Sequence, residues 1–360
     1  MPSFLIRTPC SSANIGPGFD VIGLALSLHL ELQVTIDSSK TSSQLPLNCA
    51  ITYEDKSKST ESISLDPEVN LITRVALYVL RCHNQRAFPV ETKVHIVNPI
   101  PLGRGLGSSG TAVVAGVMLG NQVGNLGLSK ERLLDYCLMI ANGVIAERHP
   151  DNVAASLFGG FVGTYLNELK PEDVARKEIP LSEVLPAPAG GIDTGVRPPE
   201  PPLGIGHYRK FAWAPEIKAI AIIPDFVVPT HTARDVLPTN YTRADVVFNL
   251  QRAALLPAAL GSSPPDPDMI FLAMQDKVHQ PYRQTLIPGL TEILQSMTPA
   301  TQPGLLGICL SGAGPTILAL ATDRFTEIAD RIIARFASNN ISCQWKLLEP
   351  AQAGTTVTPN

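Results

Sequence analysis

The longest regular pattern in the chain is an alternation of apolar residues with polar or small ones over positions 22–36. The apolar positions that share one face are Ile22, Leu24, Leu26, Leu28, Leu30, Leu32, Val34 and Ile36. A period of two predicts a β-strand with one face on a core, either one long bent strand or a pair of strands in a hairpin. His29 and Glu31 fall on the opposite face, where a solvated position is a simpler interpretation than a catalytic one.

Beyond this strand, the pattern predicts a loop and then a series of helices and strands. Residues 37–66 are polar and predict a loop with one short strand at most. Asp66-Pro67-Glu68 then combines an N-cap residue, a proline and a first-turn acid, which indicates a helix from there to about His83. The pattern next predicts a strand at 93–97, a small-residue helix at 111–122 opened by Ser108 or Ser109, a helix from Ser129 to about Ala146, and a strand at 159–165.

A break in the regular pattern divides the chain. Residues 168–212 are charged and then rich in proline and glycine, so they predict an exposed insert or linker. Beyond it we expect strands at 217–223, 305–310, 316–321 and about 342–348, with helices near 242–257, near 266–278 and after an Asp323 cap. This mixture favours an α+β fold over a doubly wound sheet. We therefore expect an N-terminal domain over 1–167 and a C-terminal domain over 213–360.

Composition narrows the class of protein. The chain has 360 residues, enough for two cores, and only 17% of them are charged. A net charge of −4 without any basic run argues against nucleic acid as a partner. Six scattered cysteines without a C-x-x-C pattern indicate reduced thiols. No signal-peptide core or bilayer-length apolar run occurs, so we expect a cytoplasmic protein without a membrane partner.

The clearest chemical feature is Pro101-Leu-Gly-Arg-Gly-Leu-Gly-Ser-Ser-Gly110, directly before the small-residue helix. Its glycines let the backbone approach a phosphate, and the helix N-terminus adds about half a positive charge. A serine hydroxyl is also a ligand for Mg²⁺. We therefore predict a nucleotide phosphate site formed by Gly103, Arg104, Gly105, Leu106, Gly107, Ser108, Ser109 and Gly110.

Other phosphate-loop types fit this segment less well. Gly105 to Gly110 reads G-x-G-x-x-G, but a dinucleotide fold needs these glycines directly after a strand and an acid about 20 residues on. Here 98–103 intervenes, and the nearest downstream acid, Glu131, falls in a helix. No Walker sequence is present. An ordinary glycine-rich turn explains the glycines but not the paired serines.

Three segments together resemble the GHMP superfamily of small-molecule kinases, named for galactokinase, homoserine kinase, mevalonate kinase and phosphomevalonate kinase. They are Thr8–Asp20, the loop ending at Gly110, and Leu310–Thr316. Residues 13–20, 148–153 and 276–283 resemble the homoserine-phosphorylating branch in particular. The resemblance implies an N-terminal ribosomal-protein-S5-like domain and a C-terminal ferredoxin-like domain, with the active site between them.

The resemblance also implies an activity. It is the transfer of the γ-phosphate of ATP, with Mg²⁺, to the side-chain hydroxyl of L-homoserine on the route from aspartate to threonine. Relatives often pair, so a homodimer is implied as well. Two alternatives stay open: a sister kinase acting on another alcohol, as mevalonate kinases do, and a non-catalytic relative that only binds a ligand. A nicotinamide-dependent dehydrogenase is a more distant alternative.

Candidate substrate residues follow from the family positions and the chemistry of an amino-acid alcohol. Asp20 is expected to hold the amino group or orient the hydroxyl, and Asn14 to bond the substrate from the same loop. Arg234 and Arg283 are candidates for the carboxylate, which a planar guanidinium binds through two parallel bonds. His149 and Asn152 lie at positions where, as the resemblance implies, the family contacts substrate. Simpler interpretations are a turn cap for Asp20, a loop histidine for His149 and surface ion pairs for the arginines.

The expected metal ligands are Ser109, with Ser108 as an alternative, and Glu147, the only acid near the family's metal position. Asn70 matches a family position near the adenine base, although an ordinary helix N-terminus explains it nearly as well.

No dedicated base is evident in the sequence. Related mevalonate kinases have an aspartate where this chain reads Asp151-Asn152. Without a dedicated base, catalysis would rest on positioning and charge neutralisation by Asp20, Asn152, Ser109 and Glu147. Asp20 as a base stays an open alternative.

Overall fold

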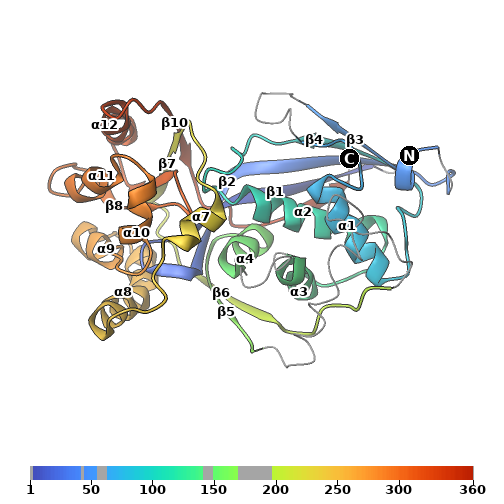
Figure 1. Ribbon diagram of the computed structural model, residues 1–360, viewed down its shortest axis with the longest axis horizontal. Coiled ribbons are helices and arrows are strands. Elements are labelled where there is room, and N and C mark those ends of the chain that lie inside the picture. Colours follow the sequence, from blue (N-terminus) through green and yellow to red (C-terminus); the bar gives the residue numbers. More distant parts are fainter. Residues whose placement is uncertain (1–2, 42–43, 55–62, 141–148, 169–196, 360) are drawn as a thin grey trace.

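The structure is a computed structural model that describes residues 3–41, 44–54, 63–140, 149–168 and 197–359. Figure 1 shows two bodies side by side, one built on a large sheet with helices α1 to α4 and the other on a small sheet with helices α7 to α12. This arrangement confirms the expected α+β class.

The large sheet has seven strands. Its main path runs in the order β11-β1-β2-β4-β3, and β5 pairs with both β2 and β6. Pairing is antiparallel except between β3 and β4. The strands are β1 (Ser3–Asn14), β2 (Gly18–Asp37), β3 (Cys49–Tyr53), β4 (Glu91–Val97), β5 (Phe161–Leu166), β6 (Gly206–Phe211) and β11 (Thr356–Pro359).

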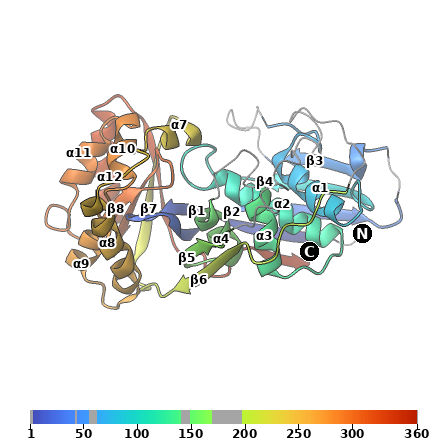
Figure 2. The same ribbon diagram turned by 60° about the horizontal axis from the view of Figure 1, so that its bottom comes forward.

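The alternating segment is one long strand, β2. Its register with β1 jumps from Pro9–His29 to Cys10–Leu26, so two extra residues of β2 form a bulge there. A bulge bends a strand and turns its side chains, which explains why Leu28 is only half-buried while Leu26 and Leu30 are buried. Beyond the bulge the β1–β2 hairpin reaches the small-sheet body, as Figures 1 and 2 both show.

Among the described residues, four helices accompany the large sheet: α1 (Leu71–Cys82), α2 (Ser108–Val123), α3 (Lys130–Ile140) and α4 (Pro150–Phe158). The expected start of α1 at Asp66 is wrong. The Asp66 carboxylate instead accepts the Glu68 N–H in a turn, and Asn70 caps the helix by accepting the Ile72 N–H. The expected end of α3 near Ala146 lies outside the described residues.

The small sheet is antiparallel throughout, in the order β10-β7-β9-β8. Its strands are β7 (Lys218–Pro224), β8 (Leu305–Leu310), β9 (Ile317–Ala321) and β10 (Cys343–Leu348). The helices of this body are α7 (Thr230–Asp235), α8 (Arg243–Gly261), α9 (Pro267–Ala273), α10 (Gln280–Arg283), α11 (Leu290–Ser296) and α12 (Phe325–Ala337).

Two helix boundaries in the small-sheet body differ from those that the sequence predicts. The helix predicted over 266–278 ends at Ala273, because the Asp276 carboxylate accepts the N–H groups of Val278, His279 and Gln280 and so starts a new helix, α10. The N-cap of α12 is Arg324, in the left-handed region, rather than Asp323.

The chain passes between the bodies more than once. Part of the segment expected as an insert, 206–211, forms β6 at the edge of the large sheet. The C-terminal strand β11 returns from the small-sheet body to pair with β1. The domain limits at 167 and 213 therefore stay a prediction. Within the described part of the chain, no helix combines the length and the apolar character that crossing a bilayer would need.

Candidate active site

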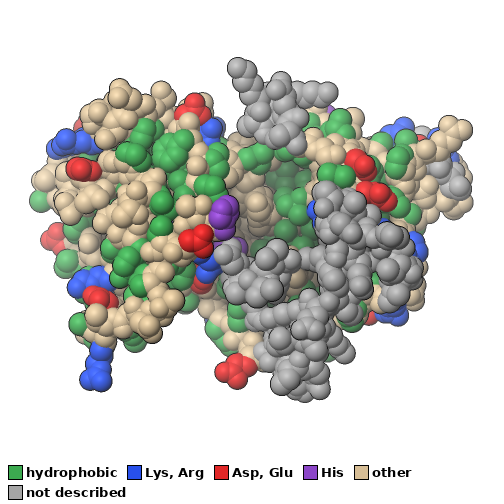
Figure 3. Space-filling view, in the orientation of Figure 1, with side chains coloured by type: hydrophobic (Ala, Val, Ile, Leu, Met, Phe, Trp, Pro, Cys, Tyr) green, Lys and Arg blue, Asp and Glu red, His purple; other side chains and the backbone are tan. Residues whose placement is uncertain are grey.

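A cleft lies where the glycine loop, the β1–β2 hairpin, the start of α4 and the 312–314 turn meet. Its volume is about 200 Å³. Figure 3 shows the molecule hollowed between the two bodies, with histidine and charged side chains along the edge. The cleft brings together these predicted residues: Asn14, Asp20, Gly103, Arg104, Gly105, Gly107, Ser108, Ser109, Gly110, His149, Asn152 and Arg283.

The glycine loop needs glycine for two physical reasons. Gly103, Gly105 and Gly107 all have positive φ, a conformation that L side chains adopt only with strain. A β-carbon at Gly105 would also collide with the Ser311 carbonyl, and one at Gly107 with the Ser11 hydroxyl. The loop therefore lies directly on its neighbours and leads into α2, whose first N–H groups have no partner within the helix. Such a helix start is suited to an anion.

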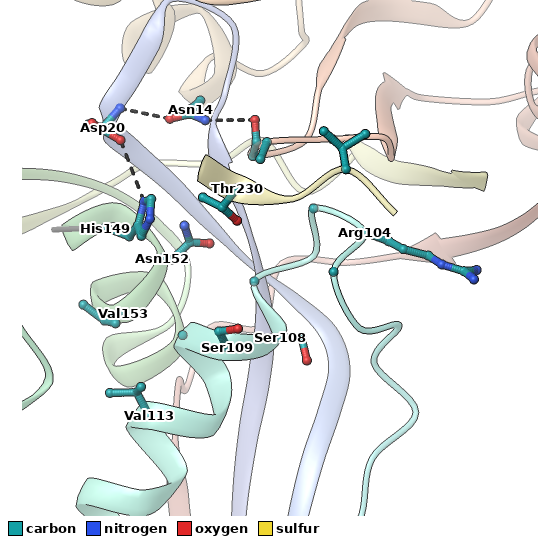
Figure 4. A pocket seen from close by; sticks show the side chains of 18 of the residues that line it. Asn14, Asp20, Arg104, Ser108, Ser109, Val113, His149, Asn152, Val153 and Thr230 are labelled. Atoms are coloured by element: carbon teal, nitrogen blue, oxygen red, sulfur yellow. Dashed lines mark hydrogen bonds and ion pairs between the residues drawn. The ribbon is translucent and has the colours of Figure 1, made fainter. Parts of the chain in front are cut away.

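Contacts with the small-sheet body hold the loop in place. The Ser311 hydroxyl donates to the Gly105 carbonyl at 2.7 Å, and the Thr316 N–H donates to the Arg104 carbonyl at 3.3 Å. The Arg104 guanidinium pairs with Asp225, just after β7, at 2.7 Å. Figure 4 shows the Arg104 side chain directed away from Ser109 and Asn152. In this structure Arg104 thus fastens the loop to the second body.

Asp20 and Asn14 are joined across the hairpin. Both have positive φ, which Asn and Asp tolerate better than most residues. The Asp20 N–H donates to Asn14 Oδ1 at 2.9 Å, and Asn14 Nδ2 donates to the Gly312 carbonyl at 3.0 Å. The Asp20 carboxylate therefore projects into the cleft from a hairpin that is fixed to the opposite body (Figure 4).

Two arginines form the positive side of the site, and both lie close to the ring of Phe19. Their guanidinium carbons lie 5.1 Å (Arg283) and 5.6 Å (Arg234) from the ring centroid. Arg234 pairs with Asp20 through both of its terminal nitrogens, at 3.0 and 3.1 Å. Arg283 donates to the Ala233 and Gly312 carbonyls and lines the cleft.

Arg283 is no surface ion pair, since only 3% of it is exposed. Burial lowers the pKa of Arg283 to about 10, which leaves it charged at neutral pH. A charge held in place by two carbonyls and largely removed from water attracts an anion strongly. Arg234, by contrast, does not line the cleft and acts on it through Asp20.

The start of α4 supplies His149, Asp151 and Asn152. Asp151 is fully buried and accepts the N–H groups of Asn14 and Asn152, at 3.2 and 2.9 Å. Burial, with a further contribution from the Asp20 carboxylate, raises the pKa of Asp151 from 3.8 to about 7. Asp151 thus ties the β1–β2 hairpin to α4.

The polar side-chain atoms of Asp20, His149 and Asp151 lie within 4.8 Å of one another, close enough to hold a metal ion. However, Asp20 already pairs with Arg234, and Asp151 accepts two backbone N–H groups. Both carboxylates therefore have partners, and we interpret the cluster as a hydrogen-bonded support.

Two further predicted site residues do not line the cleft. Leu106 is buried beneath the loop and does not line the cleft. Asn70 is a buried N-cap whose amide also donates to Tyr53 and to the Ser64 carbonyl. Among the described residues it is not part of the cleft, and its role near adenine stays a prediction. Glu147 lies outside the described residues.

The comparisons with known proteins agree with this geometry. The family models "GHMP kinases N terminal domain" and "GHMP kinases C terminal" match residues 70–160 and 265–338. The homoserine kinase of Saccharomyces cerevisiae is 61% identical over 99% of this chain and 98% of its own length. The chain belongs to the homoserine kinase family of GHMP kinases.

More distant relatives support the same membership. The homoserine kinase of Solibacter usitatus is 36% identical over 93% of this chain and 91% of its own. The crystal structure of homoserine kinase from Cytophaga hutchinsonii has a TM-score of 0.73 at 25% identity, over 99% of this chain and 97% of that one. The fold is therefore the two-domain GHMP kinase fold, and membership of a kinase family makes ATP a substrate.

Sequence reasoning did not identify three residues that the structure places at the site. Phe19, Asp151 and Ser11 are each neighbours of predicted residues in the chain, but only folding shows what they touch. Phe19 and Asp151 lie in segments that carry the family resemblance, next to Asp20 and Asn152, and this was the signal available for them. For Ser11, nothing in the pattern indicated its contact with Asn152, which is 141 positions away.

Proposed function

We propose that this member of the homoserine kinase family transfers the γ-phosphate of ATP to the side-chain hydroxyl of L-homoserine. The product is O-phospho-L-homoserine, an intermediate between aspartate and threonine. The observation that carries this proposal is the cleft itself, in which an anion-binding helix start faces an acid and a buried arginine suited to an amino acid.

The glycine loop is proposed to bind the triphosphate. Gly103, Gly105 and Gly107 allow the backbone to come close, and the start of α2 offers N–H groups and the positive end of its dipole. Ser108 and Ser109 add hydroxyl donors at the same point. The loop thus binds charge without a lysine of its own.

Asp20 and the arginines are proposed to bind the two charged ends of homoserine. The Asp20 carboxylate would accept the ammonium group, with Asn14 holding the hairpin in position. Arg283 would bind the carboxylate, supported by Arg234. His149 Nδ1 lies 4.0 Å from Asp20 Oδ1 and would complete this group of substrate-binding residues. A mevalonate-type alcohol has no ammonium group, so the same residues would bind it less well.

Phosphoryl transfer is proposed to rest on alignment. The homoserine hydroxyl oxygen forms the new bond to the γ-phosphorus while the bond from that phosphorus to the β-phosphate oxygen breaks, so that ADP leaves. The hydroxyl proton is lost late, to an oxygen of the transferred phosphate or to water. A loose transition state of this kind needs little help from a base. Both oxygens of the Asp20 carboxylate already contact Arg234, which argues against Asp20 as the group that takes the hydroxyl proton.

One residue at the cleft is suited to bind Mg²⁺. The Ser109 side chain lies at the cleft, and its hydroxyl is a hard oxygen ligand (Figure 4). Ser109 would hold the ion, which neutralises phosphate charge when bound. Glu147, the second proposed ligand, lies outside the described residues.

The test is a coupled assay for ADP release with ATP and a panel of alcohols. We expect turnover with L-homoserine and little with mevalonate. Turnover with mevalonate alone would favour the sister-kinase alternative, and ADP release with neither would favour a non-catalytic relative. Tight NADH binding without ATP binding would contradict the kinase assignment altogether.

A homodimer is the proposed assembly. The solvent-facing side of α8 has exposed Val246, Val247, Leu250 and Leu255, and exposed Leu272 lies on the neighbouring α9. Exposed apolar side chains on two neighbouring helices are a feature of many interfaces and support this assembly. Two copies related by a twofold axis would cover the same patch on each other.

A further inference from the structure

The contact that carries a further inference joins Ser11 on β1 to Asn152 on α4. The Ser11 hydroxyl donates to Asn152 Oδ1 at 2.9 Å. Ser11 is fully buried, while Asn152 lines the cleft. Their positions are 141 residues apart, so folding alone creates the pair.

The contact fixes which end of the Asn152 amide faces the reactants. A carboxamide accepts hydrogen bonds through its oxygen and donates them through its nitrogen. Because Ser11 occupies the oxygen, the Nδ2 group is the end turned to the cleft. Figure 4 shows this nitrogen on the side of Asp20 and His149. Within the described structure Nδ2 donates to no protein group, so it is available to a ligand.

Turning the amide over would be unfavourable. The buried Ser11 hydroxyl has Asn152 Oδ1 as its acceptor among the described residues, and a flip would leave that hydrogen without one. Gly107 of the phosphate loop packs directly on the pair, since a β-carbon there would meet both the Ser11 hydroxyl and Asn152 Oδ1. The amide is therefore confined between β1 and the loop.

We propose that Ser11 is a positioning residue that holds the Asn152 amide with its N–H₂ group toward the reacting oxygens. In this orientation Asn152 donates to an oxygen of the γ-phosphate or of the attacking hydroxyl, whereas a reversed amide would place a carbonyl oxygen against negative charge. Asn152 then serves as a donor and takes no proton. This inference rests on the proposed function.

The first test compares Ser11→Ala with the wild-type enzyme by steady-state kinetics. Without the hydroxyl the amide can rotate, so we expect kcat to fall roughly 10-fold to 100-fold while KM for ATP and for homoserine stays within about 3-fold. Ser11→Cys keeps a donor at the same position, although the thiol is larger than the hydroxyl and a weaker donor, so its kcat should lie between the two. It also tests the proposal if Ser11→Ala folds poorly.

Ser156→Ala is the matched control. Ser156 is also fully buried and lies on the same helix as Asn152, and its hydroxyl has no hydrogen-bond partner within the described structure. Ser156→Ala therefore removes a hydroxyl oxygen from a buried position, as Ser11→Ala does. We expect its kcat to stay within about 2-fold of the wild-type value.

A double-mutant cycle separates positioning from general packing. If Ser11 acts through Asn152, then Ser11→Ala should not lower kcat further in an Asn152→Ala background. An equal loss in both backgrounds, or a wild-type kcat in Ser11→Ala, would overturn the proposal. A wild-type enzyme that releases no ADP with homoserine would instead overturn the proposed function.

Discussion

Asp20 is the residue on which the substrate side of the cleft depends. It pairs with Arg234 through two short contacts and is fixed to Asn14 through its own N–H. The turn-cap interpretation accounts for its backbone but not for a carboxylate that faces the cleft between an arginine and a histidine. The fold thus places Asp20 where it can perform the recognition task proposed for it, which its local sequence only suggests.

The variant Asp20→Asn tests that task. Losing the charge removes the partner of the homoserine ammonium group and weakens the hold on Arg234. We expect KM for homoserine to rise at least about 10-fold, with KM for ATP nearly unchanged. Asp245→Asn is a control, since Asp245 is another partly exposed aspartate in an ion pair, with Lys277 at 3.4 Å. A collapse of kcat at unchanged KM would indicate that Asp20 is the base.

Asp151 predicts a pH dependence of stability. Its folded pKa of about 7 lies above the ordinary 3.8, so the native state holds this proton more tightly than the unfolded chain does. Its contribution is therefore complete at low pH and is lost as the pH rises toward 7. At about 1.4 kcal/mol per pKa unit, the loss between roughly pH 5 and pH 8 is about 3 kcal/mol.

Urea unfolding of Asp151→Asn checks this expectation. The amide cannot ionise, so the free energy of unfolding of the variant should gain on that of the wild type as the pH rises from 5 to 8. Asp330→Asn, an exposed change on α12, should follow the wild-type curve. Parallel curves for Asp151→Asn and wild type would show that Asp151 is ionised throughout.

At the scale of elements, periodicity located most strands and helices, while their ends depended on side-chain contacts. The alternation at 22–36 predicted β2 because one face of a half-buried strand must be apolar. Asp66 and Asp276 show the limit: each accepts backbone N–H groups, but one forms a turn before α1 and the other starts α10. The sequence shows which side chain can accept hydrogen bonds, but it does not show which backbone N–H groups donate to that side chain.

The glycine loop is the element in which close packing and chemistry coincide. Gly107→Ala would place a methyl group against Ser11 and Asn152 in a backbone with φ of 65°. We expect a rise of at least about 10-fold in KM for ATP together with a lower kcat, since the loop must move away from its support. Steady-state kinetics and nucleotide titration would measure both.

Gly127→Ala is the control for backbone strain alone. Gly127 has the same φ of 65°, but nothing lies within 4 Å of an added β-carbon. The Gly127→Ala variant should be about 1 kcal/mol less stable than the wild type and should keep the wild-type KM for ATP. Equal kinetic losses in the two variants would mean that strain, and not contact with Ser11 and Asn152, decides the result.

At the scale of the whole molecule, the apolar side of α8 predicts self-association. Leu250 is 64% exposed on this side, so Leu250→Arg should leave the fold intact but place a charge in the interface. We expect a dimeric wild type and a monomeric variant by light scattering at micromolar concentration. Leu203→Arg, at an 83% exposed leucine distant in sequence from α8, should remain dimeric. A monomeric wild type would refute the proposed homodimer.

The sequence by itself determined the family, the α+β class and most of the cleft. Three segments far apart in the chain carry the chemistry, and their residue types follow from what phosphate and an amino acid require. Asn14, Asp20 and Asn152 were therefore predicted before their positions in space were known.

Only the tertiary structure decided which of these residues support one another. Hydrogen bonds and ion pairs act over about 3 Å, whereas sequence patterns report neighbours along the chain. The pairing of Ser11 with Asn152 and the burial of Asp151 join β1 to α4, and the pairing of Arg234 with Asp20 joins the two bodies. All of these segments are far apart in the chain and meet only in the folded protein. Burial then sets the charge state of Asp151, which no local pattern encodes.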